Sequence, residues 1–216
     1  MKVQTRGVFG ILLVAWLLSS WAVAQLPQLA PFSADLQVTS TRMTGSSHEM
    51  NGKVYVDRTH LRIDMSGGPL GDTIMITNLA TKTTDALMPA QHMYMEFNGT
   101  QMPGRRPGMA PNIKSYPDPN EPCANQEGVT CKNLGVEPIN GRSCVHWQIT
   151  DKNGKVGNVW IDQKLHFPIK AADSDSTWEL TNIQESQPAA SMFGVPPGYQ
   201  KMDMGSMMQG MRPPQQ

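Results

Sequence analysis

The sequence carries no excess of charge of either sign and no apolar run long enough to span a bilayer. Lysine and arginine together number 18, and aspartate and glutamate together also number 18. This balance offers no electrostatic attraction for nucleic acid or for an anionic membrane surface. The apolar run at residues 8–18 falls short of the roughly 20 residues that a membrane-spanning helix needs. We therefore expect no nucleic-acid partner and no transmembrane anchor in the mature chain.

The amino terminus has the pattern of a secretory signal peptide, residues 1–24. Lys2 and Arg6 give it a positive start, the apolar run follows, and small residues ending at Ala24 supply a cleavage site. A retained membrane anchor is the alternative, but its helix would need a longer apolar run. No cysteine follows the run, so the lipid of a bacterial lipoprotein has no attachment atom there. The pattern predicts an exported, soluble mature protein, periplasmic or secreted.

Motifs of catalysis and of cofactor binding are absent from the sequence. It has no phosphate-binding loop, no nucleophile elbow and no paired-histidine zinc helix. Cys144 and His146 stand two residues apart, which on a strand places both on one face as conceivable metal ligands or as a nucleophile and its base. The sequence suggests no third ligand or orienting carboxylate beside them, which favours an inert cysteine and a surface histidine. We predict that the protein is not an enzyme and has no cofactor.

Three cysteines in an exported protein predict one disulfide and one unpaired thiol. If Asn140 and Gly141 form a two-residue hairpin turn, Cys144 lies opposite Glu137, and Cys131 lies six residues further along, ~20 Å away. Cysteines whose Cα atoms are more than ~7 Å apart cannot be bridged. This geometry favours a disulfide between Cys123 and Cys131, which leaves Cys144 unpaired.

The chain beyond residue 32 alternates apolar and polar residues with period two, and turn residues interrupt it every eight to twelve positions. This pattern is typical of an antiparallel sheet, and we expect a mainly β fold of roughly ten strands with few or no long helices. The strand at residues 73–77 is apolar on both faces, as expected near the centre of a sheet.

The same pattern gives the domain organisation. A short lead-in at residues 25–32 precedes one β domain at residues 33–199. A proline- and glycine-rich loop at residues 98–133 interrupts the domain, and such loops are either functional covers or disordered. Residues 200–216 carry five methionines without periodicity and are predicted to be a disordered tail.

Several short segments, taken in their order and spacing, resemble one known family. They are residues 52–57 leading into 61–64, 134–137 with 140–142 and Trp147, 159–162, 167–170 and 192–199. In these segments the chain resembles the periplasmic lipoprotein-sorting and lipoprotein-carrier (LolA/LolB-like) superfamily, and more closely its uncharacterised exported relatives. The resemblance implies a single, strongly curved antiparallel sheet, an unclosed half-barrel with an apolar concave face. Members carry acyl chains or lipidated proteins, so it also implies a lipid or lipidated partner.

The first functional hypothesis is therefore a non-enzymatic binding protein that holds an acyl chain or an apolar partner on the concave face of the sheet. A chain of about fifteen carbons offers on the order of 12 kcal/mol gross, before association costs. Filled by side chains, the same space is only the core of a structural envelope domain, which is the alternative. The residues predicted to form the binding face are Val54, Val56, Leu61, Ile63, Met75, Met93, Met95, Trp147 and Trp160.

A third hypothesis rests on the methionines of the tail. Closely spaced thioethers can gather a soft ion such as Cu(I), although thioethers alone bind weakly. The alternative is a solvated terminus without a ligand. The predicted ligands for such a periplasmic Cu(I)-handling protein are Met202, Met204, Met207, Met208 and Met211.

Overall fold

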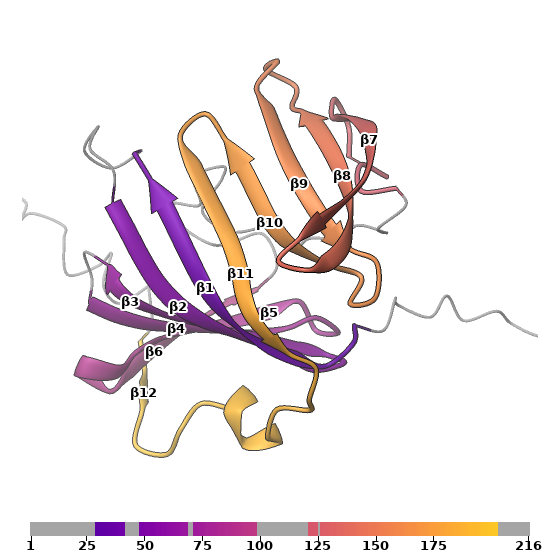
Figure 1. Ribbon diagram of the computed structural model, residues 1–216. Coiled ribbons are helices and arrows are strands. Elements are labelled where there is room, and N and C mark those ends of the chain that lie inside the picture. Colours follow the sequence, from indigo (N-terminus) through magenta and orange to yellow (C-terminus); the bar gives the residue numbers. More distant parts are fainter. Residues whose placement is uncertain (1–28, 42–47, 69–70, 99–120, 125, 203–216) are drawn as a thin grey trace, which may run out of the picture.

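The computed structural model describes residues 29–41, 48–68, 71–98, 121–124 and 126–202 (Figure 1). The predicted signal peptide lies outside these residues. So do most of the loop at 98–133 and every predicted metal ligand except Met202.

The described residues form one sheet of twelve strands with two short 3₁₀ helices, η1 (Pro89–Gln91) and η2 (Ala190–Phe193). The predicted mainly β fold is confirmed, with twelve strands in place of roughly ten. The strong curvature of the sheet stays a prediction. The strands are β1 (Phe32–Ser40), β2 (His48–Val56), β3 (His60–Gly68), β4 (Gly71–Asn78), β5 (Thr83–Met88), β6 (Met93–Asn98), β7 (Thr130–Ile139), β8 (Arg142–Thr150), β9 (Val156–Asp162), β10 (Phe167–Asp173), β11 (Ser176–Gln184) and β12 (Gln200–Lys201).

The strand order is β12-β6-β5-β4-β3-β2-β1-β11-β10-β9-β8-β7. All neighbours pair antiparallel except β12 and β6, which are parallel. Two runs of sequential hairpins, β1 to β6 and β7 to β11, meet where β1 pairs with β11. Strands β6 and β7 are consecutive in the chain but lie near opposite ends of the sheet (Figure 1).

The main hydrophobic core forms around β1. Phe32, Ala34 and Leu36 alternate with the more polar Ser33 and Asp35, so every second side chain in the first half of this strand is buried. The ring of Phe32 packs edge-on against Phe167, with 5.1 Å between ring centroids. Full burial of such a side chain contributes roughly 1.5–3 kcal/mol. The other buried members of this cluster are Leu29, Val54, Val56, Leu61, Cys144, Leu165, Ile169 and Leu180.

Residues 185–202 form a segment that we call the C-terminal strap. It leaves β11, passes through η2 and ends at β12 beside β6 (Figure 1). The Arg62 side chain donates to the carbonyl of Met192 at 2.8 Å, and the ring of Phe193 stacks on His60 at 5.4 Å. At the far end, the amide of Met202 donates to the carbonyl of Tyr94 at 2.8 Å. The strap therefore crosses one face of the strands from β3 to β6.

The start of the predicted tail differs from the expectation. Gln200 and Lys201 pair with Met93 and Tyr94 of β6, so the first two residues of the tail extend the sheet. A two-residue parallel strand leaves no alternating pattern in a sequence, and the sequence therefore predicts only a tail there.

The predicted hairpin at Asn140 and Gly141 is present, with Ile139 paired to Arg142 and Glu137 paired to Cys144. Cys131 pairs with Ile149, far from Cys144 along the strand. The disulfide joins Cys123 to Cys131, with their Cα atoms 5.9 Å apart, and Cys144 is unpaired and buried.

Candidate functional site

The strand register defines one face of the sheet that is mostly apolar, which we call the apolar face. Residues that are directly paired across neighbouring strands project from the same side of a sheet. On β2 to β6 this rule gives three rows. They are Val56, Leu61, Thr77, Thr84 and Phe97; Val54, Ile63, Met75, Ala86 and Met95; and Gly52, Met65 and Thr73, continued by Met88 and Met93.

Burial changes from row to row across this face. In the first row Val56 and Leu61 are fully buried, and the hydroxyls of Thr77 and Thr84 bond to each other at 3.0 Å. The methionines of the second and third rows are only partly buried. Methionine is flexible and polarizable and fills irregular gaps, so this part of the face can adapt to a contacting surface.

A fourth row extends the apolar face across the other half of the sheet. It runs through Trp147, Val159, Ala171, Trp178, Val38 and Met50, each paired with the next. The row crosses six strands, and five steps of about 4.8 Å give it a length of about 24 Å. All of its members except Trp147 are partly exposed. The apolar face therefore continues without a break in register from β8 to β6.

The structure places eight of the nine predicted binding residues on this face. The exception is Trp160, which pairs with His146 and Lys170 and projects from the opposite side. Trp147 pairs with Val159, so the residue after Val159 must point the other way. Sequence reasoning missed Trp178, Val38 and Met50, although the alternation of Trp178 with Thr177 and Glu179 was a usable signal.

Trp160 belongs instead to a polar cluster with His146, Glu137 and Lys170. The rings of Trp160 and His146 stack with centroids 4.3 Å apart, and the indole N–H donates to Glu137. Nδ1 of His146 lies 2.9 Å from Oε1 of Glu137, and the Lys170 ammonium lies 5.5 Å from the Trp160 ring centroid. The carboxylate that the sequence did not suggest beside His146 is thus Glu137, which comes from the paired strand β7.

Cys144 is not placed to act as a nucleophile. The side chain is completely buried, and this burial, followed by the charge of Asp162, raises the pKa of the thiol to about 11. A thiol with this pKa stays protonated at neutral pH and is unreactive. Cys144 and His146 share a strand face, as predicted, but Nε2 of His146 contacts Asn158 at 3.0 Å.

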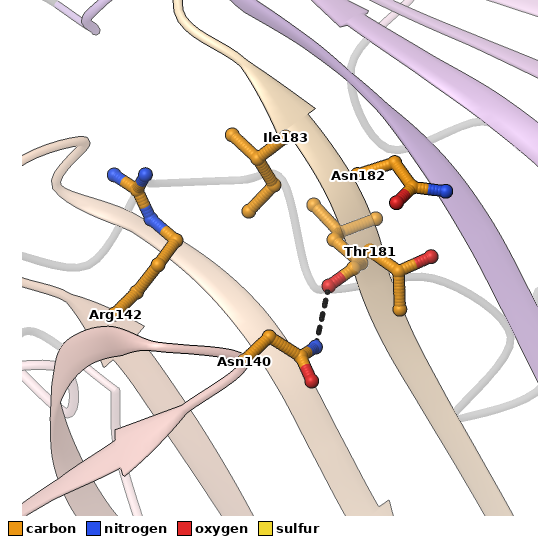
Figure 2. A pocket seen from close by; sticks show the side chains of 6 residues that line it. Asn140, Arg142, Thr181, Asn182 and Ile183 are labelled. Carbon is orange, nitrogen blue, oxygen red and sulfur yellow. Dashed lines mark hydrogen bonds between the residues drawn. The ribbon is translucent and has the colours of Figure 1, made fainter.

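A pocket of about 380 Å³ lies between the β7–β8 turn and β11 (Figure 2). Its lining residues are Asn140, Arg142, Leu180, Thr181, Asn182 and Ile183. Asn140 donates to the carbonyl of Leu180 at 3.1 Å, as Figure 2 shows.

The charge in this pocket is already neutralised. Arg142 binds the buried Asp162 through two nitrogens and Glu185 through a third, and the bond to Asp162 is the main cause that raises the pKa of Arg142. The pocket is therefore a polar, internally satisfied junction, unlike the apolar face.

Neither a metal cluster nor a spanning helix occurs in the part of the chain that the structure describes. No three His, Cys, Asp or Glu side chains there are grouped to hold a metal ion. Within the same residues, no helix combines the length and the apolar character needed to cross a membrane. The proposed thioether site stays a prediction, because Met204, Met207, Met208 and Met211 lie outside the described residues.

Comparison with known proteins gives a family and a fold. Residues 33–166 match the model of the family described as "Domain of unknown function (DUF4412)". No curated protein matches the sequence. Among solved structures, an uncharacterized conserved protein from Thermus thermophilus matches with a TM-score of 0.53 and 9% identity, over 80% of this chain and 90% of that one.

Two further matches bear on the predicted resemblance. The LolA superfamily protein NE2245 from Nitrosomonas europaea matches with a TM-score of 0.40 and 10% identity, over 79% of this chain and 92% of that one. Pseudomonas aeruginosa MucB, solved with MucA, matches with a TM-score of 0.49 and 9% identity, over 79% of this chain and 57% of that one. The predicted superfamily is thus represented among the matching structures, and at these identities the likeness concerns the fold alone.

Proposed function

The chain belongs to the DUF4412 family, and from this premise we propose that it is an exported, non-enzymatic binding protein that holds an acyl chain, of a lipid or of a lipidated protein, on its apolar face. One observation carries the proposal: the apolar face continues in register from β8 to β6, and its third and fourth rows, except for Trp147, are only partly buried. Partly exposed apolar surface of this extent marks an interaction site more often than a plain exterior.

The dimensions of the face support an acyl chain as the ligand. The row from Trp147 to Met50 is about 24 Å long. The hydrocarbon core of a bilayer is about 30 Å thick, so one acyl chain of one leaflet extends roughly 15 Å. A chain with this span therefore fits along the row with room at both ends.

The opposite face of the sheet carries part of the protein's own chain, which favours the apolar face as the side that binds the ligand. Ile76 and Leu87 project from the opposite face of β4 and β5, and both are buried. The C-terminal strap lies on this opposite face at β3, where Arg62 bonds to the carbonyl of Met192 and Phe193 stacks on His60. On the apolar face Leu61 is fully buried, whereas Met75, Met93 and Met95 are only partly buried.

Export is supported by the disulfide. A bond between Cys123 and Cys131 is typical of an oxidising compartment outside the cytoplasm. The absence of catalysis is supported by the protonated thiol of Cys144 and by the engagement of His146 with Glu137 and Asn158.

Native mass spectrometry of the protein purified from its own envelope tests the proposal. We expect co-purified lipid, and rebinding of palmitate or of a triacylated lipopeptide after delipidation. Met75→Lys should weaken binding of both probes at least tenfold, because a charge on this face loses hydration when the ligand covers it. Gln37→Lys, on the exposed opposite side of β1, is the matched control and should bind as the wild type does.

The two probes separate the two sources of the acyl chain. Preference for the lipopeptide indicates a lipidated protein, and equal binding indicates a free lipid. A protein that carries no lipid and binds neither probe would refute the proposal and favour a structural domain whose interior is filled by its own side chains.

A further inference from the structure

The methionines of the sheet are distributed unevenly. Every methionine that the structure places in a strand lies on the apolar face, and each of them is partly exposed. None of the buried apolar residues in the described part of the chain is a methionine. The strand methionines are Met50, Met65, Met75, Met88, Met93 and Met95.

The opposite face of the same strands carries apolar side chains of a different kind. Ile74 and Leu87 are directly paired there, and Ile76 is buried beside them. Methionine commonly fills irregular gaps in a protein interior, which would place it at buried positions. Here it occupies only positions of the apolar face that solvent reaches, so gap filling alone does not account for it.

Four of these residues lie next to one another on β4 to β6, and we call Met75, Met88, Met93 and Met95 the methionine cluster. Met88 pairs directly with Met93. Met75 and Met95 both pair with Ala86, which lies two residues before Met88 on the same face. Diagonal neighbours on one face of a sheet are about 7–8 Å apart, so each thioether has another within reach of its long side chain.

A partly exposed thioether reacts with a peroxide. The sulfur donates an electron pair to one peroxide oxygen, an S–O bond forms and the O–O bond breaks. The sulfur is oxidised by two electrons, and the departing hydroxide takes the proton of the transferred oxygen to leave as water. The product is methionine sulfoxide, which is polar where the thioether was apolar.

The position of the cluster determines what this change does. Ile63 and Ala86, the direct partners of Met75, have no side-chain donor that could bond to a sulfoxide oxygen. In the free protein, water hydrates that oxygen because the position is partly exposed. An acyl chain lying over it would remove the water without offering a hydrogen bond, which is unfavourable. Oxidation therefore opposes binding of the ligand more than it opposes folding.

We propose that the methionine cluster is a modification site, at which oxidation to the sulfoxide by a peroxide makes the protein release its acyl ligand. The release rests on the proposed function, whereas the oxidation itself does not. Methionine sulfoxide is reduced enzymatically, so the modification is reversible.

Peptide mass spectrometry after limited peroxide treatment tests the site. In the delipidated protein we expect each cluster methionine to gain one oxygen atom, and bound palmitate should suppress most of this gain. Met192 is the internal control, because it is also partly exposed but lies on the opposite face, and palmitate should not protect it. A cluster that stays unoxidised while Met192 is converted would overturn the inference, and so would oxidation that bound palmitate does not slow.

Binding measurements test the release. The oxidised protein should bind palmitate roughly tenfold more weakly than the untreated protein, and methionine sulfoxide reductases should restore binding without any variant. Replacing the four cluster residues by leucine keeps the apolar character and nearly the volume, so this variant should bind as the wild type does and lose little after peroxide. Met192→Leu is the matched control and should lose binding as the wild type does.

The outcomes separate the inference from the proposed function. An untreated protein that does not bind palmitate would refute the proposed function and the inference with it. Unchanged binding after the cluster has been oxidised would refute the inference alone. The native cysteines do not obscure the result, since Cys123 and Cys131 are joined and Cys144 is buried.

Discussion

Trp178 of β11 and Val38 of β1 are directly paired on the apolar face, at the point where the two halves of the sheet join. Both side chains are partly exposed and pack against the buried core around β1. This position makes Trp178 a natural reporter of any chain that lies along the row from Trp147 to Met50.

The first prediction uses this reporter. A brominated palmitate bound on the apolar face should quench the fluorescence of Trp178, and Trp178→Phe should remove a large share of the quenching. Trp160→Phe is the matched control, because Trp160 projects from the opposite face. Equal loss of quenching in the two variants would contradict the placement of the ligand.

The second prediction concerns the disulfide. Cys123→Ala should lower the free energy of unfolding by about 2–3 kcal/mol, because opening a short loop frees the unfolded chain. Cys131→Ala should cost the same, and the double variant no more than either single one, when measured by urea denaturation. Additive losses would mean that the two side chains act separately.

The third prediction concerns Asp85, whose Oδ1 is buried without a hydrogen-bond partner among the described residues. Burial, followed by the charge of Glu96, raises the pKa of this carboxyl above its ordinary value of 3.8. The folded protein therefore holds a proton there at pH values where the unfolded chain has lost it. The stability that this group contributes is full below pH 3.8 and is lost as the pH rises through the raised pKa.

Asp85→Asn removes this dependence. At neutral pH the variant should be more stable than the wild type by on the order of 1 kcal/mol, because an uncharged amide is less costly to bury. The advantage should disappear at acid pH, as followed by thermal unfolding across the range. Asp72→Asn, at an exposed position of β4, is the control and should follow the wild type. An advantage that is the same at every pH would contradict the assignment.

The fourth prediction concerns Gly52, where β2 and β3 approach closely. A Cβ atom at this position would lie 2.3 Å from the backbone oxygen of Asp64, so the two strands would have to move apart. Gly52→Ala should lower the free energy of unfolding by about 1–3 kcal/mol in urea. Gly194→Ala is the control, since a Cβ there meets no atom within 4 Å, and it should have little effect. Equal stabilities of the two variants would show that β2 and β3 tolerate the added carbon.

The sequence predicted those features that depend on local alternation. Leu61, Ile63 and Met65 alternate with polar neighbours, so the sequence alone predicts that they share one face of the sheet. The turn at Asn140 and Gly141 was likewise encoded locally, and it led to the disulfide pairing.

Features that depend on how distant strands pair were not accessible in this way. Trp147 has polar neighbours, but Trp160 lies between Val159 and Ile161, so the sequence does not decide its face. Only the register of β8 against β9 shows that the two tryptophans project from opposite faces. The sequence of β12 and of the strap before it shows no periodicity. Their positions depend on contacts with β6 and β3, which a local sequence pattern does not reveal.

The pairing of β1 with β11 also constrains the order in which the protein folds. The hairpins from β1 to β6 and from β7 to β11 need only neighbouring segments and can form early. The pairing of β1 with β11 joins one of the first strands to one of the last. It therefore forms only after the two ends of the intervening chain have been brought together. Until then the edge of β1 opposite β2 has no partner strand, and the folding chain is most vulnerable to aggregation at that edge.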